Sequence, residues 1–85
     1  MADTGEQFER GLALHDEKRY EEAVDAFTKA LEENPSSGEG WFYKAQCLFE
    51  LGRYKDSREC ISKALEINPQ HVEAMKLRFA LAGKA

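Results

Sequence analysis

Two seven-residue stretches of this 85-residue chain are nearly identical and lie 34 residues apart. KALEENP occupies residues 29–35, and KALEINP occupies residues 63–69. Comparing residues 4–35 with residues 38–69, without a gap, gives ten identities in 32 positions. Similarity at one fixed spacing indicates a structural unit that is built twice and stacked on its own copy. The unit needs this stacking because its apolar face cannot be buried within a single copy.

Each copy has the apolar spacing of two helices joined by a short turn. In the second copy Trp41, Ala45 and Leu48 recur at helical spacing, and Gly52 then ends the helix in a left-handed conformation. The second helix of each copy ends at an Asn-Pro pair, because proline has no N–H to donate and restricts the residue before it. The second helix of the second copy has the stripe Tyr54, Ser57, Ile61, Ala64 and Leu65. The equivalent positions in the first copy are Gln7, Gly11, Leu14 and His15 on its first helix, and Tyr20, Ala23, Phe27, Ala30 and Leu31 on its second.

The turns and helix starts also carry sequence signals. Lys18 stands where the second copy has Gly52, and it is the less favourable residue if the backbone there needs a positive φ. Ser36 with Glu39, and Asp3 with Glu6, have the spacing of capping boxes. We therefore expect Ser36 and Asp3 to begin helices.

The combined pattern resembles the tetratricopeptide repeat (TPR) family. It consists of Trp41, Ala45, Leu48, Tyr54, Ile61, Ala64 and Pro69 in the second copy and of Gly11, Leu14, Ala23, Phe27, Ala30 and Pro35 in the first. The departures are Gln7 in place of tryptophan, Ser57 in place of a small alanine, and Arg10 and Lys44 in place of leucine. The resemblance implies an all-α, right-handed helical-hairpin solenoid of five helices. It also implies one domain over residues 1–85, with repeats at 4–37 and 38–71 and a C-terminal capping helix at 72–83.

The predicted last helix has two apolar stripes, of which neighbouring helices can cover only one. One stripe is Val72, Met75, Phe79 and Ala82, and the other is Ala74, Leu77 and Leu81. Phe79 falls where the earlier copies have a small residue, so an ordinary partner helix would clash with it. This arrangement favours a cap that ends the array. The alternatives are that the chain is a fragment of a longer protein, or that a partner covers the exposed stripe.

The resemblance places partner-binding residues on the first helix of each unit. The implied contact residues are Phe8, Glu9, Leu12, Phe42, Tyr43, Gln46, Phe49, Glu50, Lys76 and Leu77, with His15, Asp16 and Ala80 beside them. Phe42, Tyr43 and Phe49 are three aromatic residues beyond the core stripe of their helix, which is typical of an interaction surface. The alternative is that these aromatic side chains pack between neighbouring repeats.

Other function classes have little support in the sequence. There is no phosphate-binding loop, catalytic triad or paired metal-ligand spacing, so we expect no enzyme activity, cofactor or metal. His15, His71, Cys47 and Cys60 are interpreted as two surface histidines and two packed thiols. The net charge of −4 disfavours nucleic acid as a partner. No apolar run has the ~20 residues of a membrane span, and the polar N-terminus and few cysteines favour a cytoplasmic location.

The sequence therefore predicts a non-catalytic interaction module that binds a peptide or helix of a protein partner. In the TPR modules that hold a chaperone's C-terminal carboxylate, basic residues and asparagine occupy set positions, where this chain has Phe8, Leu12, Tyr43, Glu73 and Leu77. That activity is not expected here. The alternative function is self-assembly, as a dimer or a head-to-tail stack, through the apolar last helix. Residues 1–34 carry a net charge of −6 and residues 35–85 a net charge of +2, which would favour such stacking.

Overall fold

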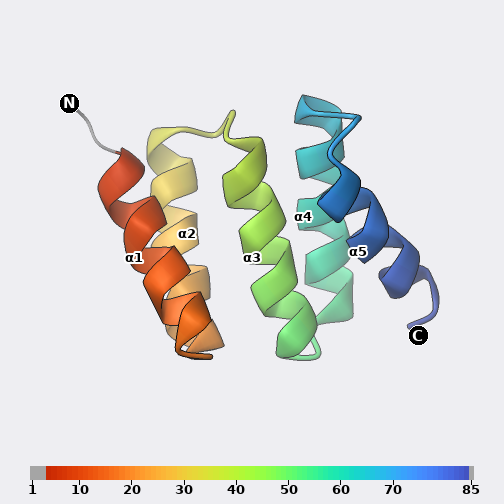
Figure 1. Ribbon diagram of the computed structural model, residues 1–85, viewed down its shortest axis with the longest axis horizontal. Helices are drawn as coiled ribbons and strands as arrows, with labels where there is room; N and C mark the ends of the chain where they lie inside the picture. The colour runs from red at the N-terminus through yellow and green to blue at the C-terminus, as the bar shows by residue number, and fades with distance from the viewer. Residues whose placement is uncertain (1–3, 85) are drawn as a thin grey trace.

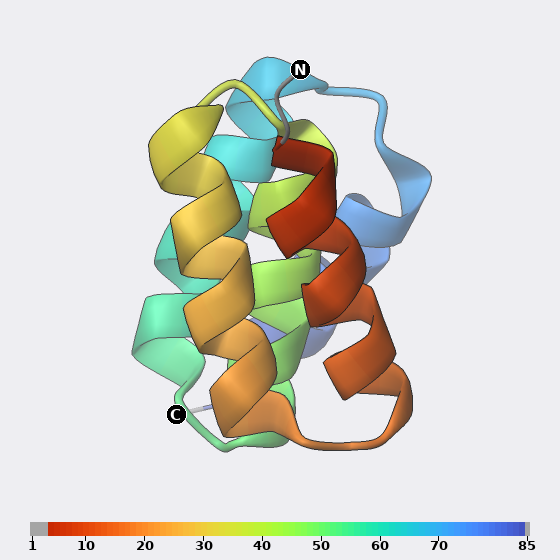
Figure 2. The same cartoon turned by 90° about the vertical axis from the view of Figure 1, so that its left-hand side faces the viewer.

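The computed structural model describes residues 4–84, which form five α-helices and, within that range, no strand. The helices are α1 (Thr4–Asp16), α2 (Tyr20–Glu33), α3 (Gly38–Glu50), α4 (Tyr54–Ile67) and α5 (Val72–Ala82). The all-α helical-hairpin prediction is confirmed. Figure 1 shows α1, α3 and α5 in one layer, with α2 and α4 behind them. In Figure 2 the antiparallel pair of α1 and α2 stands in front of the second pair.

The helix ends follow the predicted signals, with one correction. Asn34 and Asn68 end α2 and α4 in non-helical conformations, each directly before a proline. The N-cap of α3 is Ser37, whose side chain accepts a hydrogen bond from the Gly40 N–H at 2.9 Å, so the prediction of Ser36 was wrong by one residue. Ser36 instead belongs to the turn, where its N–H donates to the Asn34 side chain. The predicted cap at Asp3 lies outside the described residues.

The two turns inside the hairpins have the same backbone shape. Gly52 has a φ of +79°, and Lys18 has a φ of +62°. In both turns the next residue, Arg19 or Arg53, donates its N–H to the carbonyl of a leucine five residues earlier, at 2.9 Å. The left-handed conformation expected of Gly52 is confirmed. Lys18 adopts the same conformation with a side chain attached, which is unfavourable for an L-residue.

Small residues allow the helices of each hairpin to approach closely. A Cβ on Gly11 would stand 2.6 Å from the Phe27 ring, so α1 and α2 meet at that point. In the second hairpin Ala45 and Ile61 hold the same repeat positions and are buried. Ser57 is also buried, and its hydroxyl donates to the Ala45 carbonyl oxygen at 2.7 Å. A serine is therefore accommodated in this interface because its hydroxyl has a partner.

The hairpins are joined by contacts between α2 and α3, and α5 packs mainly on α4. Two clusters of buried side chains result, and the half-buried Val24 and Tyr43 pack against both. From α5, Ala74 and Leu81 are buried, whereas Val72, Met75 and Phe79 are exposed. The helix thus buries one of its two predicted apolar stripes and leaves the other open.

Candidate functional site

The layer of α1, α3 and α5 forms the surface on which the resemblance places partner contacts; we call it the first-helix face (Figure 1). The structure gives the predicted contact residues three different degrees of exposure. Phe42 is buried. The half-buried residues are Phe8, Leu12, Tyr43, Gln46, Phe49 and Leu77. Glu9, Glu50 and Lys76 are exposed.

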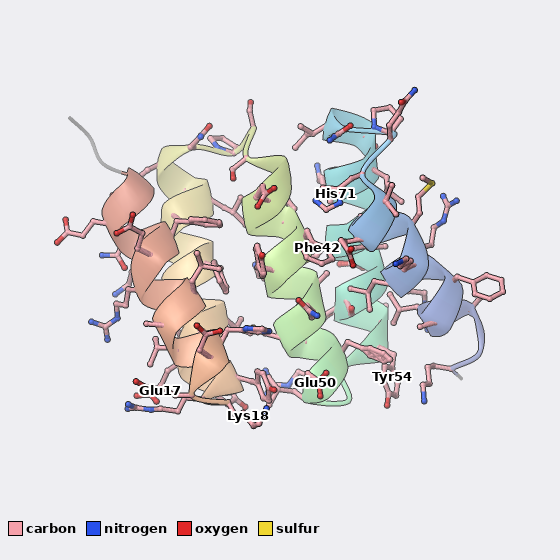
Figure 3. All side chains as sticks on the ribbon, in the orientation of Figure 1. Glu17, Lys18, Phe42, Glu50, Tyr54 and His71 are labelled. Carbon is pink, nitrogen blue, oxygen red and sulfur yellow. The ribbon has the colours of Figure 1, made fainter. Side chains whose placement is uncertain are left out.

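Phe42 needs a correction, because only 7% of it is exposed. Its ring lies 5.0 Å from that of Tyr43 and 4.9 Å from the imidazole of His71, measured between ring centroids. Figure 3 shows the side chain between α3 and α5. Phe42 therefore belongs to the core between the second hairpin and the cap, and it leaves almost no surface for a partner. The sequence-based alternative of packing against a neighbouring element holds for this residue, although that element is the cap and not the other repeat.

Tyr43 lies at the centre of the first-helix face. Its ring stacks on Phe27 with centroids 5.9 Å apart and planes at 18°. Phe8 and His15 of α1 each meet it edge-on at 5.9 Å. Tyr43 thus fills the seam between α1 and α3 while part of its ring stays accessible. Aromatic pairs in this geometry add ~0.5–1.5 kcal/mol beyond the burial of their area, so Tyr43 both joins the hairpins and offers a surface.

One carboxylate from each of the three helices of this face acts on Tyr43. Partial burial is the main cause of its raised phenol pKa, followed by the charges of Glu39, Asp16 and Glu73. These residues come from α3, α1 and α5 respectively, so negative charge converges on Tyr43 from each helix. The centre of the first-helix face is apolar with an acidic rim.

Phe49 and Glu50 lie at the end of α3 near the hairpin turns. The Phe49 ring packs edge-on against Tyr54 at 5.4 Å, and the Lys84 ammonium stands 5.7 Å and 5.5 Å from the two ring centroids. Figure 3 shows Glu50 and Tyr54 at the same end of the molecule as Lys18. Lys84 therefore partly covers Phe49, which leaves Glu50 as the more accessible of the two predicted residues.

The end of α5 is tied to α4 by a contact that sequence reasoning missed. The Arg58 guanidinium donates to the Leu81 carbonyl at 3.2 Å and to the Lys84 carbonyl at 3.4 Å. The Leu81 carbonyl also accepts the Lys84 N–H at 3.0 Å. The guanidinium thus adds a second donor at the end of α5, where a cation interacts favourably with the helix dipole. No spacing rule predicts a pair 23 or 26 residues apart, so only the packing of α5 on α4 reveals it.

The histidines and cysteines have structural surroundings. His71 is the N-cap of α5, and its Nδ1 accepts the Ala74 N–H at 3.1 Å, so it is more than the surface residue predicted. Cys47 and Cys60 are buried and free, as predicted. Burial is the main cause that raises the Cys47 pKa to about 12 and the Cys60 pKa to about 11, so both are poor nucleophiles at neutral pH. Residues 4–84 contain no group of three or more His, Cys, Asp or Glu that could hold a metal ion.

A hollow lies on the side of α3 opposite the first-helix face, where the sequence pattern predicts no function. It has a volume of about 430 Å³ and is lined by α2, α3 and α4, with Trp41, Lys44 and Lys63 among its residues. Trp41 had been assigned to a core stripe, yet it is only half-buried. Its partial exposure depends on the gap between α2 and α4, which helical spacing does not reveal.

Comparison with known proteins supports the repeat architecture. A family model described as "Tetratricopeptide repeat" matches residues 14–80. No curated protein matches the chain. Among residues 4–84, no helix is both long enough and apolar enough to cross a bilayer.

Three solved structures superpose closely. The second TPR of Spaghetti (RPAP3), bound to the HSP90 peptide SRMEEVD, has a TM-score of 0.90 at 15% identity over 93% of this chain and 73% of its own. The Arabidopsis OM64 TPR domain has a TM-score of 0.90 at 23% identity, over 92% and 64% of the two chains. The first TPR of Spaghetti, with the same peptide, has a TM-score of 0.89 at 22% identity, over 92% and 62%. At these identities the likeness concerns the fold.

Proposed function

The chain belongs to the tetratricopeptide repeat family, and we propose that it is a non-catalytic interaction module that binds a peptide segment of a protein partner on its first-helix face. Two of the similar structures have a bound peptide, which supports the general role. The observation that carries the proposal is the position of Tyr43, a half-buried aromatic ring between α1 and α3 on which one carboxylate from each of α1, α3 and α5 acts.

The charge around Tyr43 determines which peptide is suitable. Asp16, Glu39 and Glu73 act on Tyr43 itself, and Glu50 is exposed further along α3. Lys76 is the basic residue among the predicted contacts. The complementary ligand combines apolar side chains, which pack on Tyr43 and its neighbours, with Lys or Arg side chains that meet the acidic rim.

This preference is opposite to that needed for the peptide bound by the similar structures. SRMEEVD carries acidic side chains at three of its last four positions. Glu73 and Tyr43 stand at places where carboxylate-binding members of the family have basic or amide side chains. The acidic rim would repel SRMEEVD, so we expect this chain to discriminate against such tails.

A pair of matched peptides tests the proposal. The ¹⁵N-labelled protein is titrated with SRMEEVD and with SRMKKVK, and backbone amide shifts are followed. We expect the basic peptide to shift amides around Tyr43, Leu12 and Leu77, and the acidic peptide to leave them unchanged. Replacing Glu73 by Lys should weaken binding of the basic peptide, whereas Glu33→Lys, at the far end of α2, should not. A preference for SRMEEVD at this face would refute the assignment.

Self-association is a second candidate, favoured by the apolar residues left open at the C-terminal end. Phe79 is 83% exposed, and together with Val72 and Met75 of the same helix it forms what we call the α5 strip. Within the described chain the other exposed large hydrophobic residue is Ile67, at the end of α4. Two copies would therefore pair strip to strip, because α1 offers no exposed large apolar residue for head-to-tail stacking.

The strip is too small for a permanent dimer. Stable interfaces bury ~800 Å² on each partner, which is more than three partly exposed side chains supply. Sedimentation at increasing protein concentration should detect a weak dimer that Phe79→Glu abolishes and that Gln70→Glu, a change at an exposed polar residue, preserves. A monomer at every concentration would eliminate this candidate.

A further inference from the structure

The hollow behind α3 is a groove with defined walls, floor and ends. Within the described chain α2 and α4 make no direct backbone contact with each other, and α3 fills the space between them. Val24 and Thr28 of α2 form one wall, and Trp41 and Leu48 of α3 form the floor. The opposite wall belongs to α4 and includes Cys60. We call this feature the α2/α4 groove.

Both ends of the groove are held by specific contacts. At one end the Arg53 guanidinium pairs with the carboxylate of Glu21, which links the first turn of α4 to that of α2. At the other end the Trp41 indole N–H donates to the Pro35 carbonyl at 2.8 Å, which fixes the orientation of the ring. The groove is therefore preformed, and its volume of about 430 Å³ falls within the ~300–1,000 Å³ common for ligand sites.

Positive charge is concentrated at the Trp41 end. The ammonium groups of Lys44 and Lys63 stand 5.6 Å and 5.9 Å from the centroid of the Trp41 ring. Neither makes an ion pair within 4 Å to any residue of the described chain. Asp56 and Glu59 also line the groove, seven and four residues before Lys63 on α4. They therefore lie ~10 and ~6 Å closer to the N-terminus of that helix than Lys63 does. The acidic residues are thus displaced toward the Arg53 end.

We propose that the α2/α4 groove is a second binding site, separate from the first-helix face, for an acidic peptide segment of a partner protein. An apolar side chain of the peptide packs on Trp41, Val24 and Leu48. Carboxylates next to that side chain meet Lys44 and Lys63, the two lysines that line the groove. Asp56 and Glu59 restrict the acidic part of the peptide to the Trp41 end. The two faces of the molecule therefore select peptides of opposite charge.

Trp41 supplies the readout, because it is the only tryptophan in the chain. The probe is the blocked peptide Glu-Leu-Glu-Glu, and its charge-reversed match is Lys-Leu-Lys-Lys. We expect the acidic peptide, titrated to millimolar concentration, to change the Trp41 emission in a saturable and salt-sensitive way. Amide shifts should occur at Val24, Thr28 and Cys60. The basic peptide should leave the Trp41 emission unchanged.

Charge variants make the assignment specific. Lys44→Gln and Lys63→Gln should each raise the dissociation constant of the acidic peptide by about threefold, as expected for partly exposed ion pairs. The double variant Lys44→Glu/Lys63→Glu should abolish its binding. Lys29→Gln is the matched control, since Lys29 holds the position of Lys63 in the first repeat and does not line the groove. A circular dichroism spectrum checks the fold of each variant.

Three results would overturn the proposal. They are no saturable response of Trp41 to the acidic peptide, an equal response to both peptides, and equal weakening by Lys29→Gln and Lys63→Gln. None of them bears on the first-helix face, because its proposed ligand is basic and its amides lie on the other side of α3.

Discussion

The ring of Phe27 occupies the space that a side chain on Gly11 would need, since a Cβ there would stand 2.6 Å from Cε1 of Phe27. The second repeat has Ala45 and Ile61 at these two positions. The larger side chain in one helix is therefore matched by the smaller residue in the other. The two hairpins keep the same close approach with different pairs of residues.

Gly11→Ala should lower the free energy of unfolding by about 1 kcal/mol. Overpacking of a core contact opposes the fold by ~1–3 kcal/mol, and the better helix propensity of alanine offsets part of it. Adding Phe27→Ile, which copies the pair of the second repeat, should leave the double variant more stable than the two single effects predict. Urea denaturation of the four proteins measures this coupling. Gly5→Ala is the control, because nothing lies within 4 Å of a Cβ at Gly5. Strictly additive effects of Gly11→Ala and Phe27→Ile on the free energy of unfolding would contradict the pairing.

Lys18→Gly should stabilise the protein by about 1 kcal/mol, because Lys18 has a φ of +62° and glycine carries no Cβ to oppose that conformation. The reverse change in the matching turn, Gly52→Lys, should destabilise by a similar amount. Thermal unfolding followed by circular dichroism measures both. If Lys18→Gly lowered the melting temperature, the left-handed turn would not be a source of strain.

Phe42→Ala should lower the free energy of unfolding by ~3–5 kcal/mol, as for other buried aromatic residues. The loss is comparable to the total stability expected of a small domain, ~5 kcal/mol, so any effect of this variant on binding would reflect unfolding. Tyr43→Phe keeps the stacking on Phe27 and should leave the melting temperature nearly unchanged. Melting curves of both variants test the distinction. If Phe42→Ala were as stable as the wild type but no longer bound peptide, Phe42 would be a partner-binding residue and not a core residue.

Alkaline pH should destabilise the fold through its buried thiols. The folded pKa values of Cys47 and Cys60, about 12 and about 11, lie above the ordinary value of 9.0, so the unfolded chain loses these protons first. The contribution of the two protonated thiols to the free energy of unfolding is therefore fully present below about pH 9. It falls as pH rises toward 11, and the loss is about 1 kcal/mol per thiol at pH 10. Urea denaturation at rising pH measures the decline. A Cys47→Ala/Cys60→Ala protein should show a smaller decline, and an equal one would mean that other groups cause it.

Much of the candidate site could be located in the sequence but not characterised there. Phe8 and Phe42 hold the same repeat position, and the resemblance treats them alike. The structure buries Phe42 against His71 and leaves Phe8 half-exposed. The difference arises from their neighbours, since the loop into α5 covers Phe42. Helical spacing specifies which side of a helix a residue occupies, but the neighbouring elements determine how much of that side is covered.

The sequence by itself determined the number of helices, the hairpin turns and the presence of two apolar stripes on α5. These features depend on local rules: apolar spacing along one helix, the φ that Gly52 adopts and the missing N–H of proline. Only the tertiary structure decided that Phe42 is core, that Arg58 holds the end of α5 and that α2 and α4 leave a groove at Trp41. Those features depend on the distance and angle between elements far apart in the chain, which result from the packing of all the side chains together.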